Sequence, residues 1–100
     1  TVSASAFRLL PEALEMARMG VIPAGAYRNR DYVGKRLHVL EGVDQALSDL
    51  VADPQTSGGL LVALPREEAE DLLQRLLPVA PQSAIVGTVL EDQGYTVEIA

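Results

Sequence analysis

Cysteine and tryptophan are both absent from this 100-residue sequence, and histidine occurs only once, as His38. The missing cysteines exclude a disulfide framework, a thiol nucleophile and a thiolate metal site, and they are consistent with a reducing compartment such as the cytoplasm. A single histidine argues against a His-based zinc site or a Ser-His triad within this chain. We expect His38 to be a half-exposed packing residue, with a role as ligand or base as the alternative.

Long hydrophobic runs and an excess of positive charge are also missing. No apolar run approaches the ~20 residues that span a bilayer. The net charge of −6 argues against broad nucleic-acid binding. The first residues have neither an initiator Met nor a basic region before a long apolar stretch, so we expect no signal peptide and interpret the sequence as a piece of a larger protein. The hydrophobic fraction of 48% in 100 residues suffices for one domain with its own core.

The pattern of apolar residues predicts helices and strands in alternation. Helices are expected from Leu9 to Gly20, with Pro11 at the first position and Gly20 as the stop, and at residues 43–51 and 66–77. Strands are expected at residues 1–7, 37–40, 59–64 and 84–89, with a final antiparallel strand at 95–99. Residues 20–36 show neither period and are expected to form a loop. This order predicts an α+β fold, a layered α/β domain with helices packed on a mixed sheet.

The sharpest change of character in the chain lies at Asp53-Pro54-Gln55-Thr56-Ser57-Gly58-Gly59, directly before an apolar run at residues 60–64. Pro54 fixes its own φ and favours an extended Asp53. Gly58 and Gly59 permit positive φ and close backbone approach. Such a loop at the start of a strand can present amides and hydroxyls to an anion. A tight turn feeding a core strand, with Asp53 as a cap, explains the same residues.

A second candidate is the segment at residues 23–36, which holds four of the eight basic residues of the chain. Arginine forks and tyrosine hydroxyls suit a phosphate or a protein partner, and Arg28 and Asn29 stand at the centre of the segment. A solvated connection whose tyrosines pack on the core edge is the alternative. We assign the acidic residues Glu67, Glu68, Glu70 and Asp71 to a helix start that matches the helix dipole, not to a metal site.

Residues 53–61, Asp-Pro-Gln-Thr-Ser-Gly-Gly-Leu-Leu, resemble the signature of selenophosphate synthetase, also called selenide, water dikinase. Three further matches follow in the family's order, at residues 9–15, at Arg28-Asn29 with Tyr32, and at residues 84–89, so the resemblance covers nearly the whole chain. One departure is Pro23-Ala24-Gly25-Ala26, where the family usually has Pro-Gly-Gly-Thr. The front of that segment therefore lacks one glycine and one hydroxyl of the family pattern.

The resemblance implies that residues 1–100 are most of the C-terminal domain of a two-domain enzyme, with a fold like that of aminoimidazole ribonucleotide synthetase. The family makes selenophosphate from selenide, ATP and water, releases AMP and phosphate, and uses magnesium. Its members are typically homodimers, largely through their N-terminal domains. The family's catalytic Cys or selenocysteine, its essential Lys and most of its magnesium-binding Asp residues also lie in the N-terminal domain. We therefore assign no catalytic residue and no metal ligand here and expect this piece to be inactive alone.

The partners that the resemblance implies are the N-terminal domain of the same protein and the small-molecule substrate selenide, with neither nucleic acid nor membrane. We expect the loop Gln55, Thr56, Ser57, Gly58 and Gly59 to face the cleft shared with that domain, with Arg28 and Asn29 as additional contacts. Two alternatives stay open. One is a stand-alone binding or regulatory module. The other is the equivalent domain of a related ATP-dependent enzyme, such as a thiamine-monophosphate kinase, although the seven-residue signature argues against it.

Overall fold

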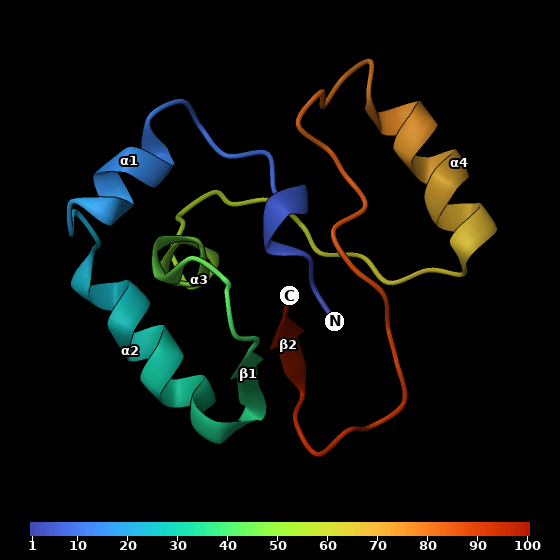
Figure 1. Cartoon of the computed structure of the whole chain (residues 1–100). Helices are drawn as coiled ribbons and strands as arrows, with labels where there is room; N and C mark the ends of the chain where they lie inside the picture. Colours follow the sequence, from blue (N-terminus) through green and yellow to red (C-terminus); the bar gives the residue numbers. More distant parts are fainter.

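Helices dominate the computed structural model, which describes residues 1–100 (Figure 1). The first three helices gather on one side of a short strand pair, whereas α4 stands apart at the upper right of Figure 1. Helices together with a small sheet agree with the α+β part of the prediction. The elements are η1 (Ala4–Ala6), α1 (Ala13–Arg18), α2 (Ala24–Val33), η2 (Gly34–Arg36), β1 (Leu37–Val39), α3 (Gln45–Val51), α4 (Arg66–Leu76) and β2 (Val97–Ile99).

The two strands pair in parallel, with His38 of β1 opposite Glu98 of β2. The predicted antiparallel final strand is therefore wrong. The two predicted partners do not pair because the N-terminal segment lies between β2 and the segment around Gly87. Val2 forms a parallel bridge to Ile99 and an antiparallel bridge to Gly87. The Val2 amide donates to the Glu98 carbonyl at 2.7 Å, and the Thr88 amide donates to the Thr1 carbonyl at 2.9 Å. Parallel and antiparallel pairing thus occur side by side in one small sheet.

Two predicted strands shrink to one bridging residue each, and a third is absent. Residues 1–7 keep only the two bridges of Val2 before the 3-10 turn η1, and residues 84–89 keep only the bridge at Gly87. The run at 59–64 forms no strand, and the side chain of Leu60 is 94% exposed. A short apolar run forms a buried strand only if another backbone pairs with it, and none does here.

Helices α3 and α4 confirm the predictions at 43–51 and 66–77. Helix α1 begins at Ala13, two residues after Pro11, and its N-cap Glu12 has a left-handed φ of 66°. The predicted stop is confirmed, because Gly20 has a φ of 82°. The Gly20 amide donates to the Ala17 carbonyl at 2.9 Å and the Val21 amide to the Met16 carbonyl at 3.0 Å, which are the two bonds of a Schellman motif.

Helix α2 occupies residues that the sequence pattern assigned to a loop, so that prediction is wrong. Pro23 precedes its first residue and Gly34, with a φ of 54°, follows its last. The side that meets the rest of the chain carries small and polar residues, including Gly25, Ala26 and Arg30. Because it has no apolar stripe, the helical period is hidden from a pattern search. The residues on this side recur at helical spacing as Gly25, Ala26, Asn29, Arg30 and Val33.

Alanine makes up most of the buried hydrophobic core. Ile99 is the one large side chain in it, fully buried at 0% exposure, and α3 lies centrally against α1, α2 and η1. Helix α4 contributes no buried residue. Every helix falls short of the length and apolar character needed to cross a membrane. The buried hydrophobic residues are Ala4, Ala17, Ala26, Ala46 and Ile99.

Candidate functional site

The Asp53–Gly59 loop follows α3 directly and lies beside the N-terminal half of α2. A Cβ built on Gly25 would lie 2.6 Å from Cγ of Pro54, so the Pro54 ring packs closely on the α2 backbone at this point. Farther along α2, Nδ2 of Asn29 donates a hydrogen bond to the carbonyl of Ala52 at 2.9 Å. The structure therefore brings together the two segments that the sequence singled out separately.

The loop itself is open and its polar groups are unused. Residues 54–64 form no backbone–backbone hydrogen bond, and no side chain among them forms one either. The hydroxyls of Thr56 and Ser57 and the amides of the loop are thus available to a ligand or partner. The carboxylate of Asp53 accepts no hydrogen bond, so the expectation that it caps the turn is wrong; its amide donates to the Leu50 carbonyl at 3.1 Å.

The loop glycines act differently from the prediction. Neither Gly58 nor Gly59 has a positive φ, so a left-handed backbone is not their role. At Gly58 an added Cβ would lie 2.8 Å from Oε1 of Gln55, whose side chain folds over this position. At Gly59 an added Cβ would meet nothing within 4 Å. Only at Gly58 does another group lie close, and that group is the side chain of Gln55 and not a backbone segment.

The basic residues of α2 divide into two groups. Arg30 forms an ion pair with Asp49 of α3, which also accepts a hydrogen bond from Nε2 of Gln45 at 3.0 Å. Arg28 is exposed and forms no ion pair. Asn29 is committed to Ala52, so its observed contact is structural. Of the two α2 residues that the sequence singled out, Arg28 is the one whose polar group forms no contact within the chain.

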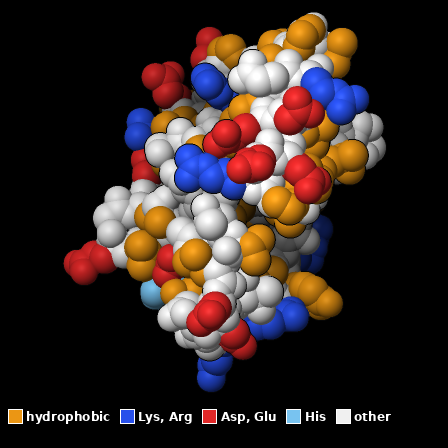
Figure 2. Space-filling model, turned by 90° about the vertical axis from the view of Figure 1, so that its right-hand side faces the viewer, with side chains coloured by type: hydrophobic (Ala, Val, Ile, Leu, Met, Phe, Trp, Pro, Cys, Tyr) orange, Lys and Arg blue, Asp and Glu red, His pale blue; other side chains and the backbone are white.

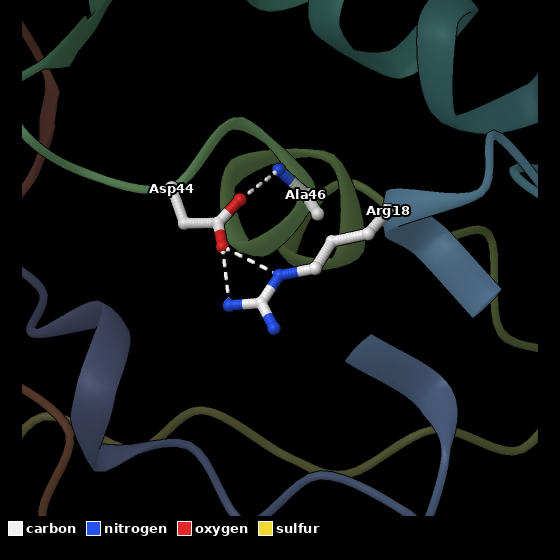
Figure 3. A network of polar contacts seen from close by, with 3 residues as sticks. All are labelled: Arg18, Asp44 and Ala46. Atoms are coloured by element: carbon white, nitrogen blue, oxygen red, sulfur yellow. Dashed lines mark hydrogen bonds and ion pairs between the residues drawn. The ribbon is translucent and has the colours of Figure 1, made fainter. Parts of the chain in front are cut away.

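An ion pair between α1 and α3 fixes the start of the helix that leads into the loop (Figure 3). Oδ2 of Asp44 accepts hydrogen bonds from Nη2 and Nε of Arg18, at 2.7 and 2.9 Å. The other oxygen, Oδ1, accepts from the Ala46 amide at 2.9 Å and so caps α3. The bonds from Arg18, followed by the bond from the Ala46 amide, hold the pKa of Asp44 below its usual range.

A cluster around Glu98 was not found from the sequence. Its carboxylate accepts hydrogen bonds from the hydroxyls of Tyr95 at 2.5 Å and Thr1 at 2.8 Å, and it lies 3.3 Å from Nδ1 of His38. The Tyr95 hydroxyl is the main cause that lowers the pKa of Glu98, and the same bond raises the pKa of Tyr95. The register that places His38 opposite Glu98 carried no sequence signal. His38 is half-exposed and packs on the Tyr95 ring, as expected.

The acidic start of α4 forms a shallow surface hollow lined by Glu67, Glu68 and Asp71 with Leu64, Leu72 and Arg75. Arg66 pairs with Glu70 at 3.0 Å and Arg75 with Asp71 at 3.9 Å, both one helical turn apart. The structure contains no group of three or more His, Cys, Asp or Glu side chains able to hold a metal ion. These carboxylates therefore offer no site for the magnesium that the family resemblance implies.

Several curated selenide, water dikinases match the chain. It is 42% identical over 83 residues to the selenide, water dikinase of Clostridium botulinum (strain Eklund 17B / Type B), and the match covers 83% of this chain and 24% of that protein. It is 48% identical over 83 residues to the selenide, water dikinase of Pelobacter propionicus, and this match covers 82% of this chain and 24% of the relative. It is 41% identical over 93 residues to selenide, water dikinase 2 of Peptoclostridium acidaminophilum, a match that covers 92% of this chain and 26% of the relative.

The chain therefore spans about a quarter of the length of these curated relatives. No family model matches it, and no solved structure does.

Proposed function

Because the chain belongs to the selenide, water dikinase family, we propose that it is part of the C-terminal domain of a selenophosphate synthetase. The observation that carries this proposal is an identity of 36–49% to members of the family. The complete enzyme would convert selenide, ATP and water into selenophosphate, AMP and phosphate in the cytoplasm. The rest of the polypeptide, including an N-terminal domain, would supply the catalytic groups, and the complete protein would form a homodimer.

Within that enzyme, the loop at residues 55–59 serves to bind and position the phosphate groups. Phosphoryl transfer depends mainly on positioning and on stabilising charge, so a second domain contributes by adding donors at the edge of the cleft. The free hydroxyls of Thr56 and Ser57 support this role, as do the unpaired loop amides. Arg28, exposed and without an ion pair on the adjacent helix, adds a guanidinium group suited to phosphate oxygens.

The loop is positioned by the helices on which it rests. Gly25 of α2 lets Pro54 approach closely, and Asn29 holds the carbonyl of Ala52 just before the loop begins. Arg30 and Asp49 tie α2 to α3 on the same side. The entry to the loop is therefore fixed, while its polar tip stays open.

Magnesium enters this proposal only through the family. No group of three or more His, Cys, Asp or Glu side chains that could hold a metal ion exists within the 100 residues, so the chain does not form a metal site of its own. We therefore derive no step through a metal ion for these residues. Their part is to present hydroxyls, amides and one arginine to oxygen atoms of the substrate.

The test is selenophosphate formation by the full-length enzyme carrying Thr56→Ala, Ser57→Ala, or both. Each lost hydrogen bond to a charged oxygen costs about 1.5–3 kcal/mol, so we expect the double variant to lose at least roughly tenfold in kcat/KM for ATP. Stability should not change, because neither hydroxyl forms a hydrogen bond within the chain. Thr88→Ala is the matched control, since the Thr88 side chain is exposed and the residue pairs through its backbone with Thr1 and not with the loop. Unchanged kinetics in the folded double variant would contradict the proposed role of the loop.

A further inference from the structure

Residues 60–64 expose four large apolar side chains within five positions. Leu60 is 94% exposed, Leu61 82% and Val62 58%, and Leu64 is also open. The segment lies in the connection between α3 and α4, on the right-hand side of Figure 1. Figure 2 views that side of the molecule, where hydrophobic side chains lie at the surface among acidic and basic ones. Contiguous apolar surface of this kind marks a site that another element covers.

The backbone of the same segment is also without partners. The last hydrogen bond before it joins the Asp53 amide to the Leu50 carbonyl, and the next joins the Ala69 amide to the Pro65 carbonyl. Between them, residues 54–64 leave every amide and carbonyl unpaired within the chain. Open backbone groups combined with Leu and Val side chains form a template on which another strand can pair.

We propose that residues 60–64 are a docking strand, on which an extended apolar segment from the rest of the full-length polypeptide pairs main chain to main chain. This inference rests on the proposed function, because it takes the chain to be one part of a longer enzyme. Alternating directions of side chains place Leu60, Val62 and Leu64 on one face of the pair and Leu61 on the other. Both faces then bury apolar surface that is now open.

The length of the relatives indicates where the segment that pairs with residues 60–64 comes from. The chain covers 24–26% of them, so roughly three quarters of such a protein lies outside these residues and is available to supply a strand. A second copy of the chain is less suitable, because each copy carries a net charge of −6. Glu67 and Glu68 lie just beyond the segment and form no ion pair. The docking segment should therefore carry Lys or Arg at the end that meets them.

The test is hydrogen exchange and amide NOE measurement on the full-length protein. We expect the amides of residues 60–64 to exchange at least ~100-fold more slowly than in an unstructured peptide, and to show NOEs to residues of the full-length protein outside these 100. Exchange at unstructured rates would overturn the proposal. NOEs from residues 60–64 to residues 84–89 of the same chain, or to a second copy in a mixed-label sample, would overturn it equally.

A pair of matched variants locates the effect. Leu61 and Leu10 are similarly exposed, at 82% and 77%, but Leu10 lies outside the docking strand. In the full-length protein, Leu61→Lys should abolish the protection of residues 60–64, and Leu10→Lys should leave it intact. The readout is independent of catalysis. Protection without selenophosphate formation leaves the docking strand in place and contradicts the proposed function, whereas activity without protection contradicts the docking strand alone.

Discussion

Gly87 allows two backbones to meet at a distance that no other residue tolerates. A Cβ at this position would lie 2.3 Å from the carbonyl oxygen of Thr1 and 3.0 Å from Cα of Val2. Both obstacles are backbone atoms in the small sheet, so they cannot rotate away as a side chain does. The close approach, and not a positive φ, is what requires glycine here.

We predict that Gly87→Ala lowers the free energy of unfolding by about 1–3 kcal/mol, because the bridge to Val2 must open or shift. Gly59→Ala is the matched control, since its Cβ would meet nothing within 4 Å and its φ is not positive. The control should change stability by less than about 0.5 kcal/mol. Urea denaturation of the three proteins checks this, and equal midpoints for Gly87→Ala and the wild type would refute it.

Single residues were predictable from the sequence where their role is local. Gly20 was identified as a helix stop because the signal lies within one turn of α1, and its φ of 82° confirms the prediction. The polar contacts of Asn29 and Arg30 reach partners 23 and 19 positions away, which no local pattern encodes. The carboxylate of Glu98 likewise depends on a strand register that brings His38 opposite it. These contacts follow from the fold and not from spacing.

At the scale of elements, α3 and α4 were predicted because their apolar residues recur at helical spacing. Helix α2 was missed because the side that packs is built from Gly25, Ala26 and Arg30, which carry no apolar period. The segment at 59–64 was predicted as a buried strand because its composition is that of one. Composition reports what a segment favours, whereas burial depends on which other segment lies beside it.

The contact between α1 and α3 should weaken in acid. The hydrogen bonds from Arg18 and the Ala46 amide lower the pKa of Asp44 below its ordinary value of 3.8. A carboxyl whose pKa is lower in the folded state than in the unfolded state stabilises the fold at pH values above its unfolded pKa. That contribution is lost as the pH falls through the folded-state pKa. We therefore predict that the thermal unfolding midpoint decreases as the pH is lowered below about 4, and that protonation of Asp44 accounts for part of this decrease.

Asp44→Asn isolates the charge, because asparagine also caps a helix start. We expect this variant to lose stability near neutral pH and to show a smaller decline between about pH 4 and pH 2 than the wild type. Asp31→Asn is the control, since Asp31 is exposed and forms no ion pair. Thermal unfolding across that pH range provides the measurement, and parallel pH profiles for wild type and Asp44→Asn would show that the ion pair does not act in this way.

At the scale of the whole molecule, the seven-residue run at Asp53–Gly59 identified the family before the fold was known. The similarity to selenide, water dikinases confirms that identification. The role of the loop stays a prediction, because its hydroxyls and amides have no partner within this chain. A sequence motif thus identifies a family more readily than it identifies the role of the motif, since that role depends on contacts with other segments.

The distribution of burial over the molecule also predicts how the chain opens. Four of the five buried hydrophobic residues are alanines, and they lie in η1, α1, α2 and α3, whereas α4 buries no residue. Free energies of local opening follow buried contacts, so α4 should open well before the cluster around α3. We predict that the amides of α4 exchange at least ~10-fold faster than those of α3 in the 100-residue chain, because about 1.4 kcal/mol of lost packing suffices for that ratio. Hydrogen exchange resolved by residue tests this, and equal protection of the two helices would show that α4 is held by more than the contacts seen here.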